Sequence, residues 1–98
     1  MASIHYAHAV IDDFNRILDH LIEYESPDAI DRFSGIRAAI NVLASSPLIG
    51  RPAMGGFREL VIGRGGRGYI ALYRYSEAMD RVTVVAIRAQ KEAGYRHP

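Results

Sequence analysis

The sequence contains no cysteine and no tryptophan, and it has only 4 prolines. Without cysteine the chain can form no disulfide, no thiolate metal site and no cysteine nucleophile. No apolar run approaches the roughly 18 to 20 uncharged residues that a membrane-spanning helix needs, and the first residues show no basic stretch followed by an apolar one. These absences predict a cytoplasmic protein that does not enter a membrane.

Residues that hold metals or mark nucleophiles are also sparse. The four histidines, His5, His8, His20 and His97, lie in different segments and show no paired spacing such as His-Glu-x-x-His. No Gly-x-Ser-x-Gly motif is present, and the glycine-rich segment 63–68 lacks the Lys-Ser/Thr ending of a phosphate-binding loop. The sequence therefore predicts neither a metal nor a cofactor.

The composition is typical of one small folded domain, which we expect to span residues 1–98. The chain is 49% apolar and 23% charged, far from the composition of disordered chains. Its charge differs between the halves. Residues 1–49 carry 3 arginines and 7 acids, net −4, whereas residues 50–98 carry 9 basic residues and 4 acids, net +5. The basic second half predicts an anionic partner.

Apolar spacing predicts two helices in the first half. Over residues 8–24 the apolar side chains recur every three or four positions and form one stripe. A second helix begins near Ser26 and is ended by Pro47. Because the connection is short, the two helices are expected to be antiparallel. Asp12 and Arg16 have the spacing of a surface ion pair.

Alternating and β-branched segments predict four strands, Ala2–Tyr6, Phe57–Ile62, Tyr69–Tyr75 and Arg81–Arg88, with a loop over 48–56. The last three are joined by short linkers and should form an antiparallel meander. The predicted fold is α+β in the order β-α-α-β-β-β, with the antiparallel helical pair packed on one face of a mainly antiparallel sheet. The other face is expected to be open, and the strand order stays undetermined.

Alternation along the third strand separates its side chains into two groups. Tyr69 and Tyr73 share one face, and Arg74 lies on the other. On an open sheet, tyrosine and arginine suit base stacking and phosphate contact or a protein interface. A purely structural role in strand packing and edge solubility is the alternative. The predicted binding residues are Arg51, Arg58, Arg64, Arg67, Arg74, Arg88, Tyr69, Tyr73 and Tyr95.

The segment after the last strand carries residue types that RNA cleavage without a metal would use. That reaction needs a base for the 2′-hydroxyl proton and cations that stabilise the phosphorane and the leaving oxygen. Arg88, Lys91 and Tyr95 could fill these roles, or they could form a simple terminal cap. Apart from this alternative, no catalytic residue is assigned.

Several motifs follow one another over nearly the whole chain: a helix over Ala9–Tyr24, Gly50–Pro52, Phe57–Leu60, Gly68–Arg74 and Val84–Tyr95. In this order and spacing they resemble the RelE/ParE superfamily of toxins from bacterial type II toxin–antitoxin systems, often called plasmid stabilization proteins. The resemblance implies the β-α-α-β-β-β fold. It also implies a cognate antitoxin whose extended C-terminal segment wraps the toxin. Without that antitoxin a homodimer is plausible, through edge pairing or an uncovered sheet face.

The resemblance implies two kinds of target. RelE-like members cut mRNA on the ribosome with basic residues and a C-terminal tyrosine, whereas ParE-like members lack that set and poison DNA gyrase. Arg88 and Tyr95 match the nuclease set, but Ile70 stands where RelE-like members place an arginine, and Ala89 where ParE-like members often place a histidine. We expect a ParE-like, non-enzymatic toxin that inhibits DNA gyrase. A ribosome-dependent mRNA endoribonuclease and a degenerate, non-toxic relative are the alternatives.

Overall fold

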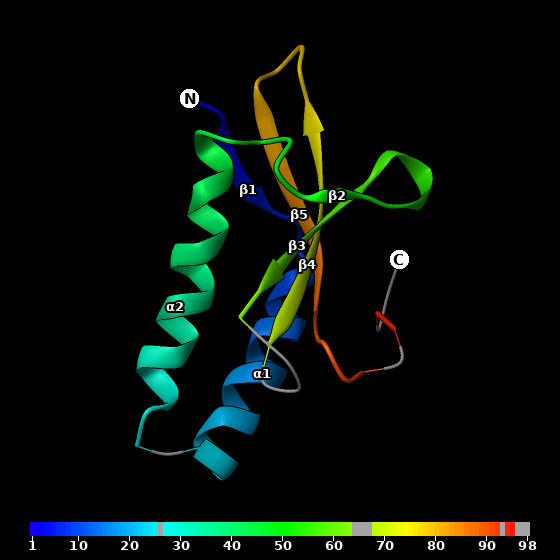
Figure 1. The fold of residues 1–98 in the computed structure, drawn as a ribbon. Coiled ribbons are helices and arrows are strands. Elements are labelled where there is room, and N and C mark those ends of the chain that lie inside the picture. Colours follow the sequence, from blue (N-terminus) through cyan, green and yellow to red (C-terminus); the bar gives the residue numbers. More distant parts are fainter. Residues whose placement is uncertain (26, 64–67, 93, 96–98) are drawn as a thin grey trace.

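The computed structural model describes residues 1–25, 27–63, 68–92 and 94–95, which form two helices against a five-stranded sheet (Figure 1). The elements are β1 (Ser3–Tyr6), α1 (Val10–Glu25), α2 (Ala29–Asn41), the 3-10 turn η1 (Val42–Ala44), β2 (Arg51–Pro52), the 3-10 turn η2 (Met54–Gly56), β3 (Arg58–Ile62), β4 (Tyr69–Ser76) and β5 (Arg81–Ala89). The predicted α+β fold is confirmed. None of the helices in these residues has the length and apolarity to cross a membrane.

The strand order is β1-β5-β4-β3-β2, which the sequence left undetermined. β3, β4 and β5 form the predicted antiparallel meander, and β2 adds a two-residue antiparallel edge to β3 within the expected loop. β1 runs parallel to β5, with Ser3 opposite Arg81 and Tyr6 opposite Val84. The sheet is therefore mainly antiparallel with one parallel pair.

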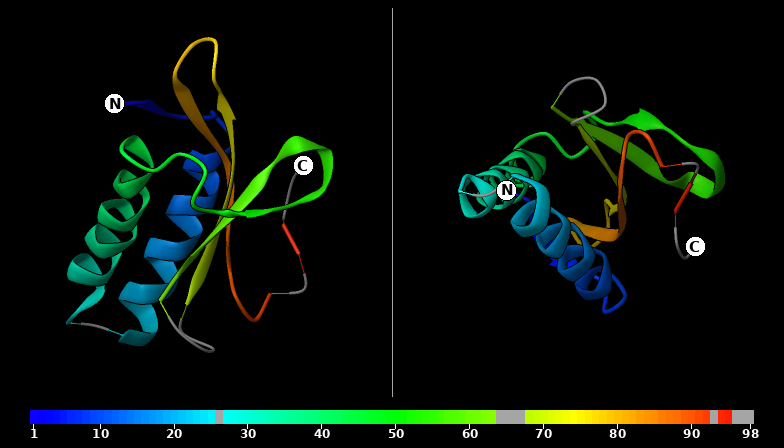
Figure 2. Two further views of the ribbon diagram at one scale, coloured as in Figure 1. Left: turned by 45° about the horizontal axis from the view of Figure 1, so that its top comes forward. Right: turned by 90° about the horizontal axis from the view of Figure 1, so that it is seen from below.

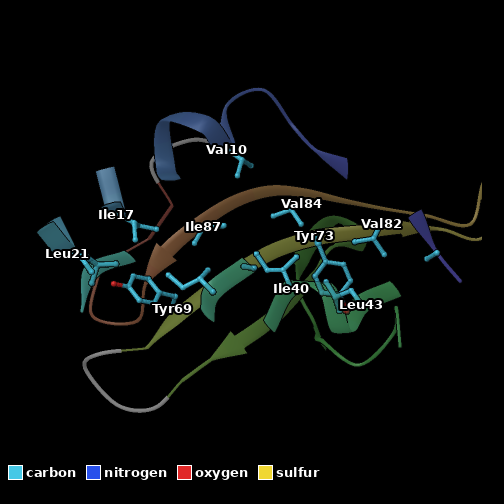
Figure 3. Close-up of a cluster of buried hydrophobic side chains, with 14 residues drawn as sticks. Val10, Ile17, Leu21, Ile40, Leu43, Tyr69, Tyr73, Val82, Val84 and Ile87 are labelled. Carbon is cyan, nitrogen blue, oxygen red and sulfur yellow. The ribbon is translucent and has the colours of Figure 1, made fainter. Parts of the chain in front are cut away.

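Both helices cover the same face of the sheet, and the C-terminal segment lies on the opposite side (Figure 2). Apolar side chains that recur at helical spacing lie on one face of a helix. In both helices this face packs against the inward side chains of β4 and β5. The core between these layers contains Val10, Ile17, Leu21, Ile40, Leu43, Tyr69, Tyr73, Val82, Val84 and Ile87 (Figure 3).

The tyrosines of β4 belong to this core and not to an exposed surface. Tyr69 is 8% exposed and Tyr73 is fully buried beneath the helices (Figure 3). The Tyr73 hydroxyl accepts a hydrogen bond from the Gly50 backbone N–H at 2.8 Å. A side chain at position 50 would lie 2.6 Å from the Tyr73 ring. The expectation that Tyr69 and Tyr73 line an open face is therefore wrong.

Candidate functional face of the sheet

The face of the sheet turned away from the helices, here called the second face, is where the predicted site residues can meet a partner. Paired residues on neighbouring strands share a face, so the strand register defines its members. They are Ser3, His5, Arg51, Glu59, Val61, Ile70, Leu72, Arg74, Ser76, Arg81, Thr83, Ala86 and Arg88.

The C-terminal segment folds back over one end of the second face. Tyr95 reaches from beyond β5 to β3, where its hydroxyl donates a hydrogen bond to Glu59 Oε2 at 2.6 Å. Glu59 also accepts a bond from Arg51 Nε at 3.1 Å. On the intervening strand β4, Ile70 and Leu72 are buried. The sequence predicted an open second face. The structure shows instead that the C-terminal segment covers part of it. We call Arg51, Glu59, Arg88 and Tyr95 the near cluster.

Arg88 holds the turn that brings Tyr95 back. Its Nη1 donates to the backbone carbonyl oxygens of Ala89, Gln90 and Glu92, at 3.2, 3.3 and 3.0 Å. The guanidinium also lies 5.1 Å from the centre of the Tyr95 ring, within the range of a cation–π contact. The Arg88 side chain therefore stabilises the C-terminal segment by binding backbone carbonyl groups of that segment.

Protonation in the near cluster follows from these contacts. The hydrogen bond from Tyr95 lowers the pKa of Glu59, and Arg51 adds to this effect, although burial acts in the opposite direction. Burial, together with the hydrogen bond to the Glu59 carboxylate, raises the pKa of Tyr95 well above its ordinary value. At neutral pH, Glu59 is a carboxylate and Tyr95 is a neutral phenol that donates to it.

A second set of contacts fastens the C-terminal turn to α1. β1 pairs with β5 only as far as Val84, so the next backbone groups along that edge of β5 need other partners. Asp13, which is only 2% exposed, accepts the Ile87 N–H at 3.0 Å. Glu92 accepts the Ala89 N–H at 3.2 Å. Carboxylates thereby continue the hydrogen bonding of the sheet where the strand has ended.

Arg16 joins these two carboxylates. It donates to Glu92 at 2.5 Å, to Asp13 at 3.3 Å and to the Ile87 carbonyl at 3.3 Å. Burial alone would lower the pKa of Arg16, but the hydrogen bonds and charges of Glu92 and Asp13 raise it above its ordinary value. The sequence indicated Asp12 as the partner of Arg16; the structure gives that position to Asp13.

The other predicted residues do not join the near cluster. Arg58 lies opposite Tyr73, on the helix side of the sheet, and donates to the carbonyl oxygens of Leu48 and Gly50 at 3.2 and 2.8 Å. Arg74 is exposed on the second face, and Lys91 is exposed in the C-terminal turn. Arg64 and Arg67 lie outside the described residues. The described part of the chain contains no group of three or more potential metal ligands.

Sequence reasoning missed two carboxylates on which this arrangement depends, Glu59 and Asp13. Glu59 lies next to the apolar residues 60–62 of β3 and is the one acid of that strand, which is a signal that the carboxylate has a specific partner. Asp13 lies on the same helical face as Val10 and Ile17, at spacings of three and four residues. An acid within an apolar stripe indicates burial with a partner, which is what the structure shows.

This arrangement of two helices on one side of a mainly antiparallel sheet is similar to that of solved structures from toxin–antitoxin systems. One similar structure is from the chromosomal ParDE TA system of P. aeruginosa, with a TM-score of 0.75 and 22% identity over 91% of this chain and 96% of that chain. Another is from the intact E. coli RelBE toxin–antitoxin complex, with a TM-score of 0.65 and 12% identity over 94% of this chain and 100% of that chain.

The fold is thus that of the RelE/ParE superfamily. Within it, residues 4–94 match the family described as the ParE toxin of the type II toxin–antitoxin system parDE, and the chain belongs to this family. None of the curated protein sequences matches the chain. The chain is therefore a ParE-type toxin of a type II toxin–antitoxin system.

Proposed function

We propose that this toxin arrests bacterial growth from within the cytoplasm by binding and inhibiting DNA gyrase. The observation that carries this choice of target is the hydrogen bond from Tyr95 to Glu59. A general base must accept a proton at the working pH. Tyr95 instead donates one, and its pKa is raised. The contact supports action through binding and opposes action through proton transfer.

A ribosome-dependent mRNA endoribonuclease is the second candidate, and one observation favours it. Arg88 lies against the Tyr95 ring at 5.1 Å, so two residues of the nuclease-like set are neighbours. In this alternative Tyr95 must leave Glu59 and lose its proton, while Arg88 must exchange three backbone carbonyls for a phosphate. Both changes require the C-terminal segment to rearrange.

We also propose that a cognate antitoxin neutralises the toxin. The two similar structures come from toxin–antitoxin systems. On this chain the helical layer leaves Ile11, Ile22 and Ile30 between 50 and 61% exposed. Exposed apolar side chains on one layer favour a partner that covers them, and a segment that folds as it binds is suited to this task.

The gyrase proposal is tested with the purified toxin in two parallel assays. One follows supercoiling of relaxed plasmid by DNA gyrase, and the other follows cleavage of mRNA on programmed ribosomes. We expect inhibition of supercoiling and intact mRNA. Cut mRNA with unaffected supercoiling, abolished by Tyr95→Phe, would establish the nuclease alternative. A toxin inactive in both assays and harmless in cells would be a degenerate relative.

The antitoxin proposal is tested by co-expression with the product of the neighbouring small gene. We expect the two proteins to co-purify and the supercoiling inhibition to disappear. Light scattering on the toxin alone measures whether it forms a homodimer through the sheet edge, and the antitoxin should convert any such dimer into the complex. Failure of the neighbouring product to bind would contradict the antitoxin proposal.

A further inference from the structure

The second face has another end, which the near cluster does not reach. There Ser3 and His5 on β1 lie opposite Arg81 and Thr83 on β5, and Thr83 lies opposite Arg74 on β4. We call Ser3, His5, Arg74, Arg81 and Thr83 the distal patch. β3 ends its pairing with β4 at Tyr73, so the hairpin that carries this patch extends past β3 (Figure 1).

The two arginines of the distal patch have no internal counter-charge. Arg74 is exposed, and neither its guanidinium nor that of Arg81 forms a hydrogen bond or ion pair with any described residue. The Nε atom of Arg81 is itself buried without a partner among those residues. The carboxylate of the nearby Asp80 is turned to the other face, where it accepts from the Tyr75 hydroxyl at 2.7 Å. The distal patch is therefore a surface of free positive charge.

The chemistry of the distal patch fits phosphate better than it fits a protein surface. Arginine, serine and threonine side chains are common donors to phosphate oxygens, and in the distal patch Ser3 is hydrogen-bonded to His5 at 3.2 Å. None of the patch residues has a large apolar side chain, and the exposed Met79 lies outside the patch, in the turn between β4 and β5. Protein interfaces rely on apolar and aromatic anchors, whereas nucleic-acid interfaces are more polar and more positive.

The burial of the tyrosines favours double-stranded over single-stranded nucleic acid as the ligand. Proteins hold single strands by stacking bases on aromatic side chains, but Tyr69 and Tyr73 are in the core. Arg74 and Arg81 are diagonal neighbours on adjacent strands, with a separation of about 7–8 Å that suits successive phosphates of one strand. We propose that the distal patch binds the phosphate backbone of duplex DNA.

This inference does not depend on the gyrase proposal, because it can be tested without gyrase. The purified toxin is titrated against a labelled DNA duplex, and binding is followed by fluorescence anisotropy between about 50 and 200 mM salt. The test variant is R74Q/R81Q, and Arg37→Gln is the matched control. Arg37 is exposed on α2 and lies over the ring of Tyr6, which packs against the core on the helix side of the sheet, opposite to the face that carries the distal patch.

We expect the double variant to bind about tenfold more weakly at low salt and to lower the salt slope by about 2, since each phosphate contact contributes about 0.9. The control Arg37→Gln should retain the wild-type slope. The variant R74K/R81K keeps both charges and should retain most of the slope, which separates a loss of charge from a loss of folding.

Three results would overturn the inference. The first is no binding to duplex DNA at low salt. The second is a loss of slope in Arg37→Gln that is half the loss in R74Q/R81Q, the same loss per charge removed, which would mean that only net charge matters. The third is tighter binding to single-stranded RNA or to a polyglutamate peptide than to the duplex, which would assign the distal patch to a different class of partner.

Discussion

Both ends of the second face contain arginines, but the arginines at the two ends differ in whether the chain supplies them with partners. In the near cluster, Arg51 contacts Glu59, and Arg88 contacts three backbone carbonyls and the Tyr95 ring. In the distal patch, Arg74 and Arg81 have no hydrogen bond or ion pair with the described residues. An arginine on a sheet face therefore indicates a binding site only where the chain itself leaves it unpartnered.

The C-terminal segment creates this difference. It crosses the near end of the face because Arg88 holds its turn and because Glu92 and Tyr95 are held at separate points, on α1 and on β3. Each contact is modest alone, but contacts on one short segment support one another. The following predictions compare residues that stabilise the covered end of the second face with Arg74 of the distal patch, which we expect to contribute little to stability.

The largest expected effect comes from Asp13→Ala. This change leaves the buried Ile87 N–H unpaired and removes a partner of Arg16. We expect the free energy of unfolding to fall by about 3 kcal/mol, measured by urea denaturation. Asp12→Ala, an exposed acid in the same helical turn, is the control and should change it by less than about 0.5 kcal/mol. Similar losses in both variants would contradict the assignment.

Arg88→Ala should have the next largest effect. The variant removes the cation that three backbone carbonyls of the C-terminal turn surround. Hydrogen bonds to charged groups suggest a loss of about 2 kcal/mol in the free energy of unfolding. Hydrogen exchange should show faster exchange at the Ala89 and Glu92 amides. Unchanged exchange there would mean that the turn forms without Arg88.

Glu59→Gln should cost about 1 kcal/mol at neutral pH, and the loss should depend on pH. The pKa of Glu59 is lowered from its ordinary value of 4.5, so the folded state favours the carboxylate. Its stabilising contribution is complete above that value and is lost as the pH falls through the folded pKa. Unfolding curves of wild type and variant should therefore converge in acid. A difference that is the same at neutral and acid pH would contradict the charge-based account.

The smallest effect on stability is expected for Arg74→Gln in the distal patch. Because Arg74 is exposed and makes no hydrogen bond or ion pair with the described residues, the free energy of unfolding should change by less than about 0.5 kcal/mol. The same variant should still weaken the binding of duplex DNA. A large loss of stability would show that the distal patch, like the near cluster, serves the fold.

Periodicity predicted the elements of this fold well, because both helices have apolar stripes and the meander strands have short linkers. It could not pair β1 with β5, since that contact joins segments more than seventy residues apart and leaves no local pattern. The short β2 also escaped prediction, because a two-residue strand carries no period. The parallel edge and the strand order required the structure.

The candidate site was predicted only in part, and β4 shows why. Alternation correctly separated Tyr69 and Tyr73 from Ile70 and Leu72, but both groups are buried. Both faces of this part of β4 are therefore apolar, and no difference in polarity along the sequence distinguishes the helix side from the second face. The proximity of Arg88 and Tyr95 was expected, whereas their contact with Glu59 depends on how the C-terminal segment crosses β4.

The most direct test of the proposed function is to express the toxin alone in a bacterial host and to follow DNA damage and protein synthesis together. Inhibition of gyrase predicts filamentation, broken or relaxed DNA and an SOS response, all before translation declines. Immediate arrest of translation with intact DNA would contradict the gyrase proposal and assign the near cluster to mRNA cleavage.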